Sequence, residues 1–149
     1  LEARDKFLLC GSYDGTISIW EISEKKSTSA NSTLSSTIYP QLRHVIDNKA
    51  IEKFPDNEGC LDEILVLNFF EKNDEGYIIV GGNNPRIQIY KIRTGLIEAQ
   101  LVGHRDSVTC MAIDGNILLT GSDDKTIRTW NLTNFKPSGI MGCDDAHEM

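Results

Sequence analysis

Short segments in which apolar and polar residues alternate run through most of the chain. In the stretch ILLTGSDDKTIRTWNL, residues 117–132, two such segments flank a turn at Asp124 and Lys125. Alternation with a period of two is typical of half-buried β-strands, and turns of this composition between them indicate antiparallel hairpins. We therefore expect an all-β chain. The predicted strands lie at about 6–11, 16–22, 50–54, 64–70, 77–82, 86–92, 96–101, 107–113, 117–122, 126–132 and 138–143.

The strand pattern repeats along the chain. Three segments align without gaps: CGSYDGTISIWEI (10–22), VGGNNPRIQIYKI (80–92) and TGSDDKTIRTWNL (120–132). Their aromatic residues are Trp20, Tyr90 and Trp130, and the last two are 40 residues apart. Upstream, GCLDEILVLNF (59–69) aligns with GHRDSVTCMAI (103–113), which places Cys60 where His104 stands. The repeat predicts units of four short antiparallel strands, over segments of about 1–58, 59–102 and 103–146.

The first two aromatic residues are 70 residues apart, and an insertion at about 23–49 accounts for the excess. Its beginning, SEKKSTSANSTLSST, has nine Ser or Thr residues in fifteen. Such a segment cannot bury enough apolar surface to offset its ordering entropy. The composition predicts a flexible loop outside the core, and a regulated phosphorylation loop or a docking segment is the alternative.

Composition and charge narrow the function classes. The hydrophobic fraction of 40% and the charged fraction of 25% are typical of a soluble globular protein, and no apolar run reaches the roughly 18 residues that span a bilayer. The net charge is −7 without a basic patch, so we expect neither nucleic acid nor membrane as a partner. The four cysteines form no C-x-x-C pair, which favours reduced thiols inside the cell.

Cofactor and metal motifs are missing from the sequence. There is no phosphate-binding loop and no dinucleotide-binding glycine motif. Cys143 and His147 stand four residues apart, but no second pair completes a zinc site. We therefore expect no cofactor and no metal.

The last repeat resembles the WD-repeat family, which builds β-propellers. The resemblance implies blades of four antiparallel strands. A propeller closes with about four to eight blades, and this chain supplies about three. We expect further blades outside this sequence, and a ring of several copies is the alternative. The residues that carry the resemblance are Gly103, His104, Gly121, Ser122, Asp124 and Trp130, with Ser12, Asp14, Gly15 and Trp20 in the first repeat.

The resemblance implies a buried hydrogen-bond chain in the last blade. Its members would be Trp130, the hydroxyl of Ser122 (or Thr120, on the same strand face), His104 and Asp124. The first blade would place Ser12, Asp14 and Trp20 in the same roles. A catalytic triad is the competing interpretation, but no G-x-S-x-G elbow is present and the hydroxyl would lie beneath a Trp.

The middle repeat departs from the pattern and is expected to depend on packing. Gly82 lacks the hydroxyl, and Asn84, Tyr90 and Cys60 replace the Asp, Trp and His. The apolar residues predicted to hold this blade together are Leu65, Leu67, Ile78, Val80, Ile87 and Ile89.

The family resemblance implies a non-catalytic scaffold for protein–protein interaction within a multiprotein complex. The alternative is an accessory propeller domain of an enzyme whose catalytic part lies elsewhere. The expected partners are other proteins and the remaining blades, in the cytoplasm, with a cytoskeletal or ciliary assembly as one setting. The candidate partner-binding face carries Tyr13, Asn83, Asp123 and Arg105, of which Tyr and Arg fit interface preferences.

Overall fold

The computed structural model describes residues 2–4, 6–28, 34–47 and 63–142. Every regular element in these ranges is a strand, so the expectation of an all-β chain is confirmed. Within the same ranges, no helix has the length and apolar character to cross a membrane. The strands are β1 (Glu2–Arg4), β2 (Phe7–Gly11), β3 (Thr16–Thr28), β4 (Leu34–Asp47), β5 (Ile64–Lys72), β6 (Glu75–Gly82), β7 (Ile87–Lys91), β8 (Ile97–Leu101), β9 (Val108–Asp114), β10 (Ile117–Ser122), β11 (Thr126–Asn131) and β12 (Lys136–Gly142).

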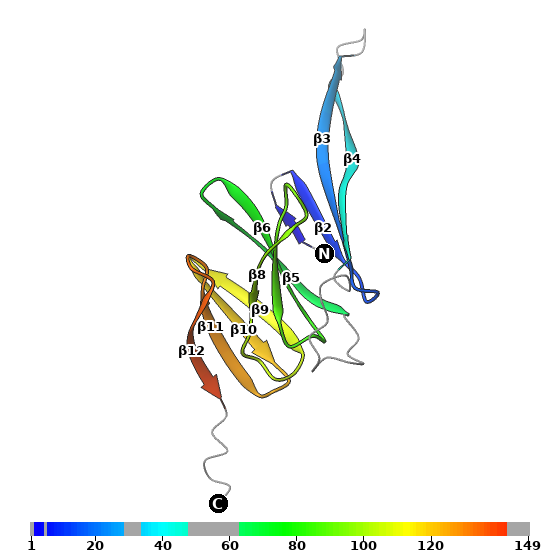
Figure 1. The fold of residues 1–149 in the computed structure, drawn as a ribbon. Coiled ribbons are helices and arrows are strands. Elements are labelled where there is room, and N and C mark those ends of the chain that lie inside the picture. Colours follow the sequence, from blue (N-terminus) through cyan, green and yellow to red (C-terminus); the bar gives the residue numbers. More distant parts are fainter. Residues whose placement is uncertain (1, 5, 29–33, 48–62, 143–149) are drawn as a thin grey trace, which may run out of the picture.

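The strands form three antiparallel sheets of four strands, each in chain order. The first sheet contains β1 to β4, the middle sheet β5 to β8 and the third sheet β9 to β12. Figure 1 shows the sheets side by side, with the middle sheet between the other two. This arrangement matches blades of a partial propeller. The strand predicted at about 50–54 lies outside the described residues.

Two apolar cores separate the three sheets. In the first, Leu9, Ile17 and Ile19 pack with Ile78 and Val80 of the middle sheet. In the second, the alternate residues of β6, Tyr77 and Ile79, pack with Val108, Leu118 and Trp130 of the third sheet. Because successive side chains of a strand point to opposite faces, β6 buries both of its faces and reads as a continuous apolar run. Each fully buried aliphatic side chain contributes about 1.5–3 kcal/mol.

One face of the third sheet is exposed, whereas the corresponding face of each of the other two sheets is covered by the next sheet. Ile127 aligns with Ile17 and Ile87 in the sequence repeat. Ile17 and Ile87 are 0% exposed, whereas Ile127 is 46% exposed. The face that covers a neighbouring sheet in the first two units is therefore open in the third.

In every sheet, the pairing between the third and fourth strands shifts its register at the same point. The shift falls between Ile19 and Trp20 in the first sheet and between Thr129 and Trp130 in the third. In the middle sheet it falls between residues 89 and 90. In each sheet, one residue of the fourth strand is left without a register partner, which is the mark of a β-bulge.

A further shift explains one wrong packing prediction. Leu65 is 37% exposed, although it was expected in the core of the middle blade. Ile64 pairs with Gly82 and Val66 with Gly81, so Leu65 is the extra residue of a bulge. Ile64 is buried instead and packs in the first core.

Most of residues 23–49, predicted to form a flexible loop outside the core, lie in two paired strands in the structure. β3 and β4 pair residue by residue from Thr16 with Asp47 to Thr28 with Leu34. Figure 1 shows this hairpin projecting well beyond the other strands. The hairpin continues a register that the first blade already fixes, so the ordering cost per added pair is lower than for an isolated hairpin. The flexibility of this segment remains a prediction.

Candidate functional site

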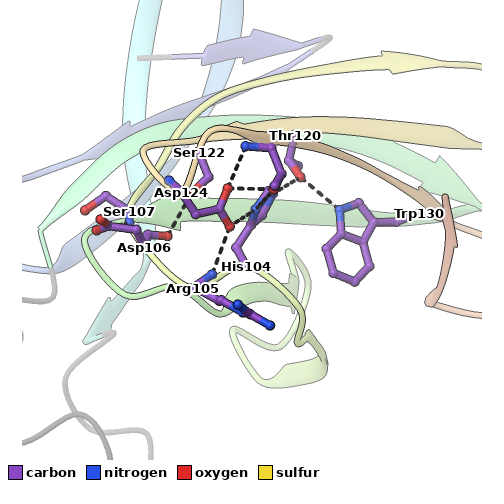
Figure 2. A network of polar contacts seen from close by, with 9 residues as sticks. His104, Arg105, Asp106, Ser107, Thr120, Ser122, Asp124 and Trp130 are labelled. Carbon is purple, nitrogen blue, oxygen red and sulfur yellow. Dashed lines mark hydrogen bonds and ion pairs between the residues drawn. The ribbon is translucent and has the colours of Figure 1, made fainter. Parts of the chain in front are cut away.

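A chain of hydrogen bonds connects β11, β10 and the loop before β9. The indole Nε1 of Trp130 donates to Thr120 Oγ1 at 2.9 Å. Thr120 Oγ1 lies 2.8 Å from His104 Nε2, and His104 Nδ1 lies 2.8 Å from Asp124 Oδ2. With the imidazole proton on Nδ1, each hydroxyl or N–H in this chain donates to the next acceptor. Figure 2 shows the four side chains in this order.

The carboxylate of Asp124 collects several donors at the turn between β10 and β11. It accepts from the backbone N–H of Arg105 at 2.9 Å and from the backbone N–H and hydroxyl of Thr126 at 2.8 and 2.6 Å. Desolvation by burial raises the pKa of Asp124, but the bonds from Thr126, Arg105 and His104 outweigh it. The resulting pKa lies far below the ordinary value, so the group is an anion at neutral pH.

Thr120, rather than Ser122, supplies the hydroxyl of this chain. Trp130 pairs with Leu118, which places Thr120 one diagonal step along β10 on the same face. Ser122 lies a further two residues away, or about 6.6 Å along the strand. Its hydroxyl instead donates to the carbonyl of Asp106 at 3.1 Å and accepts the N–H of Asp124 at 3.1 Å.

The first sheet has the same hydrogen bonds within the turn between its second and third strands. It lacks the hydrogen-bond chain that connects this turn to the indole. Asp14 Oδ1 accepts from the N–H and hydroxyl of Thr16 at 2.9 and 2.6 Å, and Ser12 Oγ accepts the N–H of Asp14 at 3.3 Å. Cys10 aligns with Thr120, however, and a thiol is a weak hydrogen-bonding group. The indole of Trp20 donates to Ser18 on its own strand, at 3.1 Å. Trp20 therefore does not join Ser12 and Asp14 in one network.

The middle sheet fills the corresponding positions differently. Val80 aligns with Thr120 and is buried in the first core, and Tyr90 is 2% exposed. Asn84 Oδ1 accepts the N–H of Arg86 at 3.0 Å. A Cβ on Gly82 would lie 1.9 Å from the carbonyl oxygen of Glu63, so close backbone approach requires a glycine there. Cys60 lies outside the described residues.

Hydroxyl, imidazole and carboxylate follow one another as in a catalytic triad, but the hydroxyl is not accessible to a substrate. Thr120 is 1% exposed, and its oxygen lies against the buried Nε1 edge of the Trp130 ring. The His104 side chain is fully buried and that of Asp124 is 7% exposed. A nucleophile must reach its substrate, so these groups serve to fix the turn and the entering loop.

A row of hydrogen bonds crosses the three sheets at the end that holds this network. The N–H of Ile64 donates to the carbonyl of Ser12 at 3.3 Å. Asn83 donates to Glu63 through its backbone at 3.1 Å and through its amide at 2.7 Å. Ser107 then donates its hydroxyl to Asn83 Oδ1 at 3.4 Å and accepts the N–H of residue 123 at 3.0 Å. These bonds join the three turns between second and third strands into one surface.

The four residues of the predicted partner face all lie on this surface. Tyr13 is 72% exposed, and the side chains of Arg105 and Asp123 are also exposed. Asn83 is half-buried because it bonds to both neighbouring loops. The structure thus brings the three turns together, with Asn83 as a connector rather than a free side chain.

Sequence reasoning missed two residues of the row, Glu63 and Ser107. They occupy the same position in the alignment of residues 59–69 with 103–113. Both precede a first strand and both bond to the turn of their own sheet. Their shared position in this alignment is the sequence signal that could have identified them.

Comparison with known families finds a match in two parts of the chain. The family described as "WD domain, G-beta repeat" matches residues 3–21 and 95–131. The matched regions contain the first turn and the whole Trp130 network.

Curated relatives match the chain over parts of its length. WD repeat-containing protein pop2 of Schizosaccharomyces pombe is 42% identical over 64 residues, which are 43% of this chain and 9% of that protein. Protein ROOT INITIATION DEFECTIVE 3 of Arabidopsis thaliana is 38% identical over 63 residues, or 40% of this chain and 14% of that protein. The Neurospora crassa Mitochondrial division protein 1 is 26% identical over 133 residues, covering 89% of this chain and 15% of that protein. The chain thus spans no more than about a sixth of the length of these relatives.

Solved structures share the fold at low identity. The WD40 repeats of RRP9 superpose with a TM-score of 0.66 at 17% identity, covering 95% of this chain and 36% of that one. The computationally designed Ika4 protein gives a TM-score of 0.65 at 22% identity, covering 93% of this chain and 68% of that one. These similarities show the fold alone.

Proposed function

Because this chain carries repeats of the WD40 family, we propose that it is a non-catalytic segment of a protein-interaction scaffold within a multiprotein complex. WD-repeat proteins generally hold other proteins in complexes. The partner would bind the surface formed by the three turns between second and third strands. The remaining blades of a propeller would be further intramolecular partners, and we place the protein inside the cell.

The row of hydrogen bonds from Ser12 to residue 123 carries this proposal. A binding surface costs less to use when its loops are already ordered, since ordering entropy then need not be supplied on association. The network of Trp130 anchors one end of the row through Asp124, which holds the backbone of Arg105. The strands thus set the spacing of the turns, and the turns present the side chains.

Two side chains on this surface have the chemistry of interface anchors. Tyr13 exposes 72% of its surface at the tip of the first turn and offers a rigid apolar ring with a polar end. Arg105 is exposed beside the third turn and offers a forked donor for carboxylates or carbonyls. Asp123, also exposed, adds an acceptor next to Arg105.

The test is capture of partners from cell extract by the complete protein, with wild type compared against Tyr13→Ala combined with Arg105→Ala. Truncation of a hot-spot residue typically costs about 2 kcal/mol or more, so recovery of at least one partner should fall severalfold. The melting temperature should stay within about 1 °C, because both side chains are exposed and the Arg105 bond to Asp124 uses the backbone.

A matched control is Leu96→Ala combined with Lys136→Ala. It also removes one exposed apolar side chain, 67% exposed, and one exposed cation, at the opposite end of the sheets. Its partner recovery should equal that of wild type. Equal recovery of every partner with the Tyr13 and Arg105 variant would place the binding surface elsewhere.

A further inference from the structure

A cleft lies at the opposite end of the sheets, between the base of the β3–β4 hairpin and the middle sheet. Its volume is about 610 Å³, within the range of about 300–1,000 Å³ that is common for binding pockets. The cleft is formed by the starts and ends of strands far from the three turns described above. It is therefore separate from the proposed scaffold surface.

The floor of the cleft is apolar and firmly held. Phe69 and Ile92 are 3% and 4% exposed and belong to the first core, and the partly buried Phe7 packs against that core and lines the cleft. Gly76 lies over this floor, since a Cβ there would come within 3.2 Å of Ile92 and 3.3 Å of Phe69. The missing side chain brings the cleft close to these two groups, and the apolar lining that stays partly accessible is Phe7.

One wall of the cleft is a fixed ion triad of the first sheet. Glu21 lies between Lys6 Nζ at 2.9 Å and Arg43 Nε at 2.6 Å. Hydrogen bonds from Lys6 and then Arg43 lower the pKa of Glu21. Next to the triad, His44 Nε2 donates to the carbonyl of Arg93 at 2.8 Å and connects the hairpin to the turn between β7 and β8. The carboxylate on this wall, Glu21, is therefore already paired with two cations.

The other wall carries three carboxylates that have no cation of their own. Glu71, Asp74 and Glu75 line the cleft around the turn between β5 and β6, and among the described residues Arg93 is the one further cation in the lining beside Lys6 and Arg43. Among the described side chains, none forms an ion pair with these three groups. Asn73 and Asp74 have φ of 52° and 60°, which are the dihedrals of a two-residue hairpin turn, so the backbone that carries the Asp74 carboxylate has a defined conformation.

We propose that this cleft binds a peptide segment in which one large apolar side chain is flanked by lysine or arginine residues. The apolar side chain would occupy the floor above Gly76, against the partly buried ring of Phe7, where water is displaced from apolar surface. The flanking cations would pair with Glu71, Asp74 and Glu75. Apolar anchors within a charged rim are the usual anatomy of protein recognition sites. The partner would be a second protein, held at the end opposite Tyr13.

The test uses fluorescence anisotropy with the complete protein and a labelled heptapeptide that has a central phenylalanine between two pairs of lysines. Two further peptides replace the phenylalanine by alanine or the lysines by glutamates. We expect each replacement to weaken binding at least tenfold. Absence of binding by the first peptide, or equal binding of all three, would overturn the proposal.

The matched protein variants separate the cleft from general charge attraction. Glu71→Gln, Asp74→Asn and Glu75→Gln together remove three negative charges from the cleft, and Asn at position 74 tolerates the positive φ. The control, Glu24→Gln with Glu98→Gln and Asp114→Asn, removes three exposed carboxylates outside the cleft and outside the proposed partner face. The cleft variant should bind the peptide at least tenfold more weakly, and the control within twofold of wild type. Equal weakening by both would refute the site.

Two additional variants keep the outcome decisive. If the triple variant melts below wild type, the single exposed change Glu71→Gln should still weaken binding severalfold, and wild-type affinity there would count against the cleft. The Tyr13→Ala and Arg105→Ala variant should bind the peptide as wild type does. The Tyr13 and Arg105 variant thus tests the scaffold proposal, and the variants of the cleft carboxylates test the cleft proposal.

Discussion

Trp130 and Thr120 lie on a diagonal across β11 and β10, and the indole of one donates to the hydroxyl of the other at 2.9 Å. Both residues are almost fully buried, at 0% and 1% exposure. The same oxygen lies 2.8 Å from His104. One hydroxyl therefore satisfies the indole Nε1 of Trp130 and the imidazole Nε2 of His104, for which no other hydrogen-bond partner is seen among the described residues.

Replacement of Thr120 by valine should destabilise the complete protein by about 1–3 kcal/mol, because two buried polar groups lose their partner. The shape of the side chain is kept, so the loss reports the hydroxyl. The check is urea unfolding. Ser122→Ala should cost less, since its bonds are to backbone groups at the half-exposed turn. A larger loss for Ser122→Ala would reverse the assignment of the hydroxyl.

Asp124→Ala should cost about 1–3 kcal/mol in the same assay, since it leaves several donors unpaired. Asn84→Ala, at the same position in the middle sheet, should cost less. Asn84 is uncharged, and hydrogen bonds to neutral groups contribute less than those to charged ones. Equal losses would show that the charge of Asp124 has no special role in its turn.

Acid should weaken wild type more than Asp124→Asn. The pKa of Asp124 is lower in the folded than in the unfolded state, where it is about 3.9. The unfolded state therefore takes up the proton first as pH falls, and the stabilisation present above about pH 5 is lost progressively below it. Urea midpoints measured from pH 6 to pH 2.5 should converge for the two proteins. A constant difference across this range would exclude an ionised Asp124 as the source.

Gly81→Ala should destabilise by about 1–3 kcal/mol through overpacking. A Cβ there would lie 2.9 Å from Val66 and 3.0 Å from Val108, in the core between the middle and third sheets. Gly142→Ala is the control, because its Cβ would meet only Thr126, at an ordinary 3.7 Å. Thermal unfolding of both variants is the measurement, and a harmless Gly81→Ala would mean that the two sheets are less closely packed than described.

Amide hydrogen exchange should separate a paired hairpin from a loop at residues 36–42. β4 is an edge strand, so amides that face β3 should exchange slowly and the intervening ones fast. A flexible loop would give fast exchange at every amide. NMR-detected exchange on the complete protein distinguishes the two patterns residue by residue.

The repeat in the sequence predicted three sheets and most strand positions, because alternation and turn residues are local signals. It could not choose between Thr120 and Ser122, since both present hydroxyls on one face of a strand. Only the register, which pairs Trp130 with Leu118, decides between them. Composition alone does not reveal the hairpin at 23–47, because its strands extend a pairing that begins within the first blade.

The cleft was beyond the reach of sequence reasoning. Its lining comes from segments around residues 6, 43, 74 and 92, none of which carries a motif. The exposed position of Leu65 was also unpredictable, because a bulge moves a residue off its expected face without changing the alternating pattern.

The bulge shared by the three sheets has a consequence for how the strands find one another during folding. In the first sheet the extra residue is Arg43, and it pairs with Glu21. In the middle sheet the extra residue is Glu98, and it pairs at 3.3 Å with Lys91, which aligns with Glu21. The two ion pairs occupy one structural position with opposite polarity.

If β4 and β8, the fourth strands of the first two sheets, exchanged places, Arg43 would face Lys91 and Glu98 would face Glu21. Each native pair is partly exposed and contributes at most about 1 kcal/mol. The exchange would replace both pairs by contacts between like charges, and each of these contacts would be unfavourable. Similar repeats in one chain are prone to pair with the wrong neighbour as they fold. The reversed polarity therefore gives each outer strand a preference for its own sheet, at the point where the backbones of the two sheets are most alike.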